Sequence, residues 1–243
     1  MLDDWYLRDV PRLISETERL YARIVEKYPE RTREFVTKQR IVTVRKWEPT
    51  LHRYEDRFEA VIRQLGCFYI PKIMPPGPAF VFPIKDVDGT YSCAQTKPLE
   101  GSALAGKTRY RYIGDKPVGP RWLGNDPATL RLIIEKRAVM CVEGPFDLLA
   151  MRLMSPEYPI LSPLTKFLGK NHIAYLRMLG VKQLFIMFDN EVGGEEAMEQ
   201  QARQVKSMVV KPCACPRKDP SAALEEEYGA RDLARWVKQS FGY

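Results

Sequence analysis

The feature that most constrains the fold is a regular alternation of apolar runs and amphipathic segments in the second half of the chain. The runs at 138–142 (A-V-M-C-V) and 184–188 (L-F-I-M-F) have the length and composition of strands that are buried on both faces. Segments with helical periodicity follow them, which is typical of a parallel sheet with right-handed crossover helices. The sequence therefore predicts an α/β fold. We expect strands at 138–142, 158–161, 183–188 and 208–211, and helices at 127–137, 146–154, 165–179, 194–207 and, as two short helices, within 221–239.

Three acidic signatures occur in order within this half of the chain. They are V-E-G-P-F-D at 142–147, F-D-N-E-V-G-G at 188–194 and K-D-P at 218–220. Open α/β sheets build their sites at the carboxyl ends of the strands, so these carboxylates should meet at one edge. Carboxylates gathered there would repel one another unless a divalent cation held them, and Mg²⁺ is the usual occupant. The pattern predicts a metal site for phosphoryl chemistry. The candidate catalytic and metal-binding residues are Glu143, Asp189 and Glu191, and Asp147 and Asp219 are further candidate metal-binding residues.

A second explanation stands beside the metal site for several of these residues. A carboxylate that follows a strand often caps the next helix, and for Asp147 or Asp189 taken alone this is as good an explanation. Asp219 precedes a proline, a pair that also begins turns and helices. Glu143 is harder to explain as a cap, because an unpaired glutamate against a buried strand is costly.

The first half of the chain has a different organisation. Amphipathic helices are expected at 11–28 and 54–65, followed by strands at 79–85 and 90–96 that flank the turn sequence D-V-D-G, and by a third strand at 109–114. We therefore expect a smaller, basic α+β subdomain over 1–126 and the parallel-sheet domain, with its C-terminal helices, over 127–243. A chain of 243 residues can bury a core of that size.

Positive charge is concentrated in the first half. The chain has a formal net charge of +7, and residues 89–121 contain six Lys and Arg against two Asp and Glu. Alternation in R-Y-R-Y at 109–112 would place both arginines on one face of a strand and both tyrosines on the other. Such a segment suits a phosphate backbone or a nucleotide. The candidate nucleotide- and DNA-binding residues are Lys97, Lys107, Arg109 and Arg111.

Cysteine usage and hydropathy indicate the compartment. Five scattered cysteines favour reduced thiols over a disulfide framework. The pair Cys213 and Cys215 has no second pair with zinc-ligand spacing, so no zinc is expected. No apolar run approaches the length of a membrane span, and the first residues do not form a secretory signal. We expect a cytoplasmic protein with no membrane partner.

Residues 138–220 resemble a Toprim domain, the metal-binding fold of bacterial-type primases, topoisomerases and some nucleases. The primase pattern E-G-x-x-D is similar to residues 143–147, and F-D-x-D-x-A-G is similar to 188–194, with Glu191 in place of the second Asp. Upstream, F-P-I-K-D-V-D-G at 82–89 resembles the hairpin of the DnaG-type RNA polymerase domain. Lys97 and the pair Arg111-Tyr112 are the nearest equivalents of the basic positions in that family. Ser221 replaces the family's acid after Asp-Pro.

This resemblance implies the catalytic core of a bacterial or phage DnaG-type primase, working in the cytoplasm of a bacterial cell or of a phage-infected host. Such an enzyme is a nucleotidyltransferase that binds single-stranded DNA and nucleoside triphosphates and makes short RNA primers with Mg²⁺ or Mn²⁺. A replicative helicase and a separate zinc-ribbon protein are the further partners it implies. Two alternatives stay open: a Toprim nuclease, and a degenerate primase that acts as a nucleic-acid- or helicase-binding module.

Overall fold

The computed structural model describes residues 60–61, 64–70, 79–85, 91–98, 110–114, 120–188, 194–224, 226 and 228–242. The described residues fall into two units, one within Ile62–Gly119 and the other made of residues 60–61 and those within Pro120–Tyr243. The expected helix at 11–28 and most of the expected helix at 54–65 lie outside the described residues. The division at residue 126 stays a prediction.

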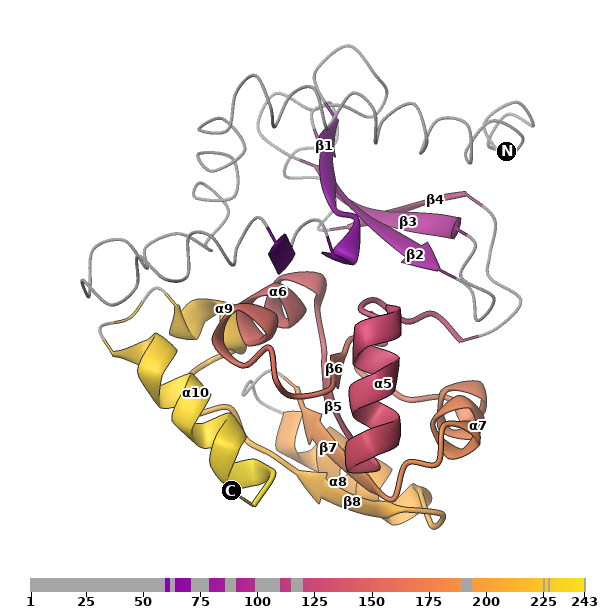
Figure 1. The fold of residues 1–243 in the computed structure, drawn as a ribbon, viewed down its shortest axis with the longest axis vertical. Coiled ribbons are helices and arrows are strands. Elements are labelled where there is room, and N and C mark those ends of the chain that lie inside the picture. The colour runs from indigo at the N-terminus through magenta and orange to yellow at the C-terminus, as the bar shows by residue number, and fades with distance from the viewer. Residues whose placement is uncertain are drawn as a thin grey trace. The chain divides into compact units, whose positions relative to one another are not determined.

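The first unit contains an antiparallel sheet with the strand order β1-β2-β3-β4 (Figure 1). The strands are β1 (Phe68–Ile70), β2 (Ala79–Lys85), β3 (Tyr91–Pro98) and β4 (Arg111–Gly114). The expected β2–β3 pair is confirmed, and the third expected strand is confirmed with a later start. The short strand β1 was not expected. Phe80 and Phe82 are buried in β2 and meet edge to face, with ring centroids 4.8 Å apart.

The second unit contains a parallel sheet with the order β6-β5-β7-β8, flanked by helices, which confirms the predicted α/β fold. Its strands are β5 (Ala138–Val142), β6 (Ile160–Leu161), β7 (Gln183–Met187) and β8 (Val209–Pro212). Its helices are α5 (Pro127–Lys136), α6 (Pro145–Met154), α7 (Lys170–Met178), α8 (Gly194–Gln204), α9 (Pro220–Ala223) and α10 (Gly229–Ser240).

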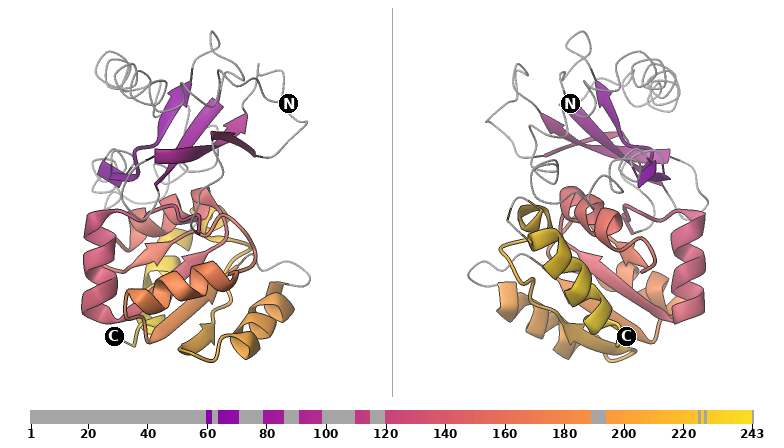
Figure 2. Two further views of the ribbon diagram at one scale, coloured as in Figure 1. Left: turned by 90° about the vertical axis from the view of Figure 1, so that its right-hand side faces the viewer. Right: turned by 60° about the vertical axis from the view of Figure 1, so that its left-hand side comes forward.

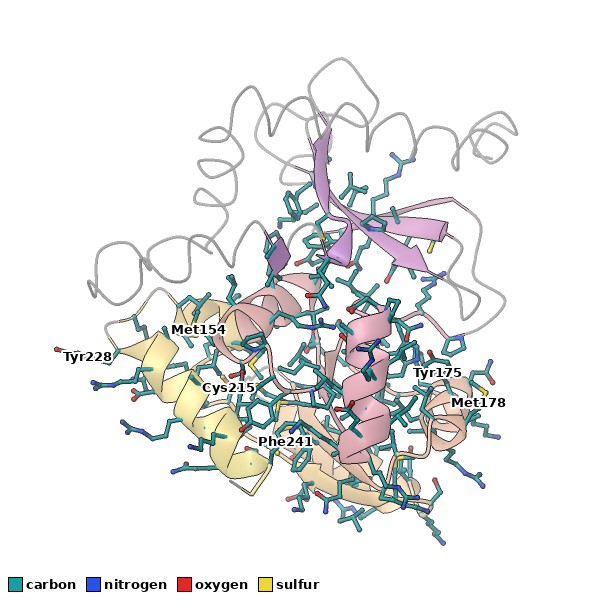
Figure 3. All side chains as sticks on the ribbon, viewed as in Figure 1. Met154, Tyr175, Met178, Cys215, Tyr228 and Phe241 are labelled. Atoms are coloured by element: carbon teal, nitrogen blue, oxygen red, sulfur yellow. The ribbon has the colours of Figure 1, made fainter. Side chains whose placement is uncertain are left out.

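Helices cover both faces of this sheet, as Figure 2 shows. On one face, α5, α7 and α8 pack on alternate residues of β5 and β7, including Val139 and Leu184. On the other face lie α6, α9 and α10. Phe241, which follows α10, packs on Phe185 of β7 with the two ring centroids 4.6 Å apart. Tyr175 and Phe241 mark the two faces in Figure 3. Burial on both sides explains why β5, and β7 after Gln183, are continuous apolar runs.

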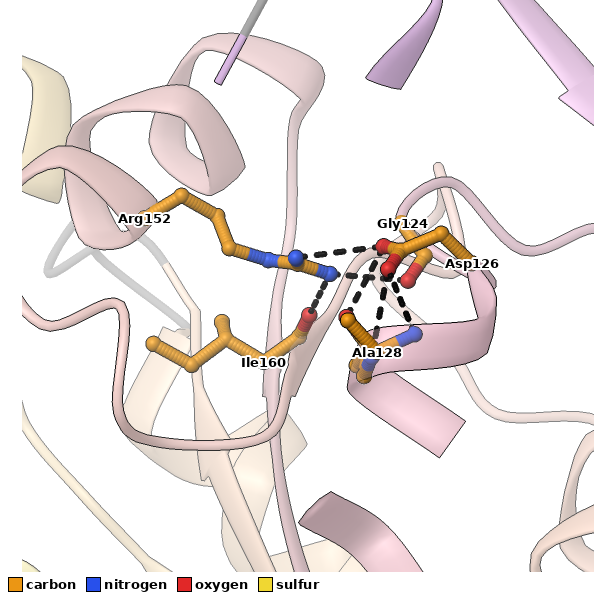
Figure 4. Close-up of polar contacts among 6 residues, drawn as sticks. Gly124, Asp126, Ala128, Arg152 and Ile160 are labelled. Carbon is orange, nitrogen blue, oxygen red and sulfur yellow. Dashed lines mark hydrogen bonds and ion pairs between the residues drawn. The ribbon is translucent and has the colours of Figure 1, made fainter. Parts of the chain in front are cut away.

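A buried ion pair fixes the position of α6 (Figure 4). Arg152, near the end of this helix, places its Nη1 atom 3.2 Å from Oδ2 of Asp126, and the two side chains are only 4% and 10% exposed. Its Nη2 atom donates to the carbonyl oxygens of Gly124 and Ile160, at 2.8 and 3.0 Å. Asp126 also accepts from the Ala128 amide and so caps α5. One arginine therefore joins α6, β6 and the start of α5.

The main difference from the predicted elements is the start of α7. The sequence predicts a helix from residue 165, whereas the structure begins it at Lys170. Gly169 is the N-cap of α7 and has extended φ and ψ angles of −70° and 170°, so the right-handed helix does not include the residues before Lys170. The apolar side chains of Leu164, Phe167 and Leu168 imitate helical spacing, but they belong to a loop over 163–169 that joins β6 to α7. Phe167 is 54% exposed in that loop.

His172 holds the start of α7 in place. Its Nδ1 atom accepts a hydrogen bond from the Gly169 amide at 3.2 Å, so the neutral ring carries its proton on Nε2. Nε2 lies 3.2 Å from the Arg121 carbonyl oxygen, to which it can then donate. The ring also meets Trp122 edge to face. Burial lowers the pKa of His172, an effect that the hydrogen bond to the Arg121 carbonyl opposes.

We expect His172 to make the stability of the chain sensitive to mild acid. Above a pH of about 6.5 the ring is neutral in both the folded and the unfolded chain, and its full contribution to the free energy of unfolding is present. As the pH falls below that value, the unfolded chain takes up the proton first, so stability is lost until the lowered pKa of the folded state is passed. Urea midpoints at pH 7.5 and 5.0 should therefore differ more for the parent than for His172→Asn, whose amide oxygen can still accept from Gly169. Equal differences would contradict this role.

The five cysteines are buried free thiols. Within the described part of the chain, no helix combines the length and the apolar character that crossing a membrane requires.

Candidate metal centre

Glu143 is the first residue after β5, at the carboxyl edge of the parallel sheet. The register pairs Val142 with Met187, so β5 and β7 end side by side. The Glu143 carbonyl oxygen accepts a hydrogen bond from Oγ of Ser162, the residue that follows β6, at 2.9 Å. The Glu143 side chain is only 17% exposed, and its Oε1 atom lies 3.9 Å from Nζ of Lys166. The structure thus places the first predicted carboxylate where a parallel sheet builds its site.

Asp147 lies in the first turn of α6 and is buried. Its Oδ2 atom accepts from the Gly144 amide at 3.0 Å, and its Oδ1 atom accepts from the Ser221 amide at 3.4 Å. A Cβ atom at position 144 would lie 2.8 Å from Asp147 Oδ2, so a larger residue would displace this carboxylate. The glycine of the E-G-x-x-D pattern therefore makes room for the aspartate three residues later.

Asp219 is the N-cap of α9 and is also buried. Its Oδ1 atom accepts from the Ala222 amide at 2.6 Å and from the Ser221 hydroxyl at 2.8 Å. Ser221 consequently donates to two carboxylates, its amide to Asp147 and its hydroxyl to Asp219. Ser221 stands where the family that the sequence resembles has an acidic residue. Through these two hydrogen bonds it links the first acidic signature to the third.

The structure describes three of the five candidate metal-binding residues, Glu143, Asp147 and Asp219. Asp189 and Glu191 lie outside the described residues, and among those described no three Asp, Glu, His or Cys side chains come together as a metal site. Glu143 fits a hard divalent cation, because it offers carboxylate oxygens and a cationic ammonium group already approaches one of them. Asp147 and Asp219 accept hydrogen bonds from N–H and O–H donors. This arrangement suits residues that hold the neighbouring backbone in position and do not bind the metal themselves.

The predicted basic residues do not all share one surface. Lys107 and Arg109 lie outside the described residues. In the β3–β4 pair, Arg111 stands opposite Thr96 and Tyr112 stands opposite Gln95. Because strand side chains alternate, Lys97 points to the opposite face from Thr96 and Arg111. Lys97 indeed packs its Nζ atom 5.4 Å from the centre of the Tyr110 ring, so lysine and tyrosine share one face and Arg111 faces the other way.

The chain matches no family model, and no curated protein matches its sequence. Solved structures do match it. The RNA polymerase domain of Mycobacterium tuberculosis primase DnaG has a TM-score of 0.66 at 17% identity, over 97% of this chain and 84% of that one. A DnaG primase catalytic domain bound to single-stranded DNA has a TM-score of 0.62 at 14% identity, over 98% and 80% of the two chains.

A third structure contains an additional domain. The Aquifex aeolicus primase, solved with its zinc-binding and RNA polymerase domains, has a TM-score of 0.69 at 20% identity. The match covers 95% of this chain and 60% of the Aquifex structure. Across these matches the chain has the fold of DnaG-type primase catalytic cores.

Proposed function

We propose that this chain is a primase catalytic core that polymerises ribonucleotides into short primers on single-stranded DNA. The observation that carries the proposal is the position of Glu143. This largely buried glutamate directly follows the inner strand β5 of a parallel sheet, within a fold shared with DnaG catalytic cores. The neighbour solved with single-stranded DNA supports that template class.

The predicted residues form three groups with different roles in this proposal. Glu143, Asp189 and Glu191 would hold Mg²⁺ or Mn²⁺, which neutralises the triphosphate and polarises the attacking 3′-hydroxyl when bound. Asp147 and Asp219 would keep the strand ends in position through their contacts with Ser221. Lys97, Lys107, Arg109 and Arg111 would contact phosphates of the template or the nucleotide. A helicase and a zinc-ribbon protein are proposed as partners on the resemblance alone.

One assay tests this function against both alternatives. The purified chain is incubated with single-stranded DNA, labelled ribonucleotides and Mg²⁺ or Mn²⁺, and the products are separated by length. Labelled products that grow with time are the expected result. Shortened DNA would instead identify a nuclease, and binding of DNA without any turnover would identify a degenerate module.

Arg111 offers a test of the template contact. A side chain that neutralises one phosphate releases counterions, so Arg111→Ala should make the log–log salt slope of single-stranded DNA binding shallower by roughly 0.7. Arg131→Ala is the matched comparison, because it removes one exposed arginine from α5, a helix that contains none of the proposed binding residues. The salt slope of this variant should stay at the parental value. A parental slope in folded Arg111→Ala would remove this residue from the template surface.

A further inference from the structure

Lys166 lies beside the candidate metal centre, although it belongs neither to the acidic signatures nor to the basic segments. Its Nζ atom is 3.9 Å from Glu143 Oε1. The lysine side chain is 53% exposed, whereas the glutamate side chain is 17% exposed. An ammonium group with access to solvent therefore stands next to a mostly buried carboxylate.

The backbone around Lys166 is fixed on two sides. Ser162 Oγ donates to the Glu143 carbonyl at 2.9 Å and accepts from the Leu164 amide at 3.1 Å, which ties the start of the loop to the end of β5. Gln201 Nε2 donates to the Lys166 carbonyl oxygen at 3.1 Å. Gln201 is buried in α8, the helix that follows the second acidic signature. The loop over 163–169 is thus hydrogen-bonded both to the segment that contains the first acidic signature and to the helix next to the second.

A contribution to stability does not account for this arrangement. An ion pair between a half-exposed lysine and a carboxylate at this distance adds little to folding, because water screens the charges and the long side chain loses freedom. Lysine combines a compact charge with a flexible stem, so a fixed backbone still leaves its ammonium group able to reorient. Ammonium groups of this kind commonly bind phosphate.

We propose that Lys166 is a phosphate-binding residue of this site. Its ammonium group neutralises Glu143 while the site holds no metal, and it turns to the triphosphate of the incoming nucleotide when a divalent cation is bound at Glu143. The reason is electrostatic: a divalent cation at the carboxylate repels the ammonium group, while the triphosphate brings several negative charges that attract it. This inference rests on the proposed function, since it assigns a residue to the nucleotide of that reaction.

Two binding measurements on Lys166→Gln test the inference without any measurement of synthesis. Affinity for Mn²⁺ alone, followed by electron paramagnetic resonance, should rise about twofold to threefold, because a competing cation has been removed. Affinity for a nucleoside triphosphate with Mn²⁺ present, followed by calorimetry, should fall about tenfold, because a charged phosphate contact has been lost. A residue with a purely structural role would not move the two affinities in opposite directions.

Matched variants and the parent chain make the outcomes distinct. Lys166→Arg keeps the charge and should stay near the parent in both measurements. Lys182→Gln removes an exposed lysine just before β7, at the opposite end of the strands, and should change neither affinity. If the parent makes primers but Lys166→Gln binds nucleotide as the parent does, the assignment of Lys166 is overturned and the proposed function stands. A parent that binds no nucleotide and makes no primers overturns both.

Discussion

Replacing Arg152 with methionine is expected to lower the free energy of unfolding by about 3–5 kcal/mol. The substitution removes one partner of a buried ion pair and leaves the Asp126 carboxylate without its cation. It also removes the donor that the carbonyl oxygens of Gly124 and Ile160 share. Chemical denaturation of the parent and the variant measures the effect directly.

Two further variants identify the ion pair as the cause. Arg131→Met removes an exposed arginine from the neighbouring helix α5, and its effect should stay within about 0.5 kcal/mol. The double variant Arg152→Met with Asp126→Asn should lose less free energy of unfolding than the two single variants lose in sum, because it no longer buries the Asp126 charge without its arginine. A loss below about 1 kcal/mol for Arg152→Met would show that the pair contributes little.

The second large effect is expected on catalysis. Glu143→Gln and Asp189→Asn each remove one negative charge while keeping nearly the same shape, so the site loses affinity for its cation but the chain should still fold. We expect either change to reduce primer synthesis by at least about 100-fold, on the scale of other charge-stabilising groups in active sites. Calorimetric titration with Mn²⁺ should show weaker binding in both variants.

A matched surface variant serves as the control for these two. Glu157→Gln removes the same kind of charge from an exposed turn after α6 and should keep parental synthesis and metal binding. Circular dichroism establishes that each variant is folded. Parental synthesis by a folded Asp189→Asn or Glu143→Gln chain would remove that residue from the catalytic site.

The fold of the second unit could be predicted because strands that are buried on both faces consist of consecutive apolar residues, which are visible in the sequence. Both faces of β5 and β7 are covered by helices. Accordingly β5, and β7 after its exposed first residue Gln183, are apolar runs that end where the candidate site residues begin. The start of α7 could not be predicted in the same way. Leu164, Phe167 and Leu168 have helical spacing, but the extended backbone of Gly169, the N-cap of α7, places the start of the helix after them.

The candidate site was predictable only in part, for a related reason. Glu143 follows a strand and carries a charge, so its position is visible in the sequence. Lys166 and Gln201 reach the site from elsewhere in the chain, and only the folded arrangement brings them near it. The opposite orientations of Lys97 and Arg111 depend on the β3–β4 register, which the R-Y-R-Y alternation alone does not determine.

The hydrogen bond from the Ser221 amide to Asp147 spans 74 residues of sequence. During synthesis on the ribosome, the chain would contain the first two acidic signatures well before it contains Ser221. At that stage Asp147 could accept from the nearby Gly144 amide, but its second oxygen would lack this partner. Closing such a loop costs entropy that only the packed sheet and helices can offset. The hydrogen bonds that hold Asp147 would therefore be complete only after Ser221 has been translated and the sheet and helices have packed.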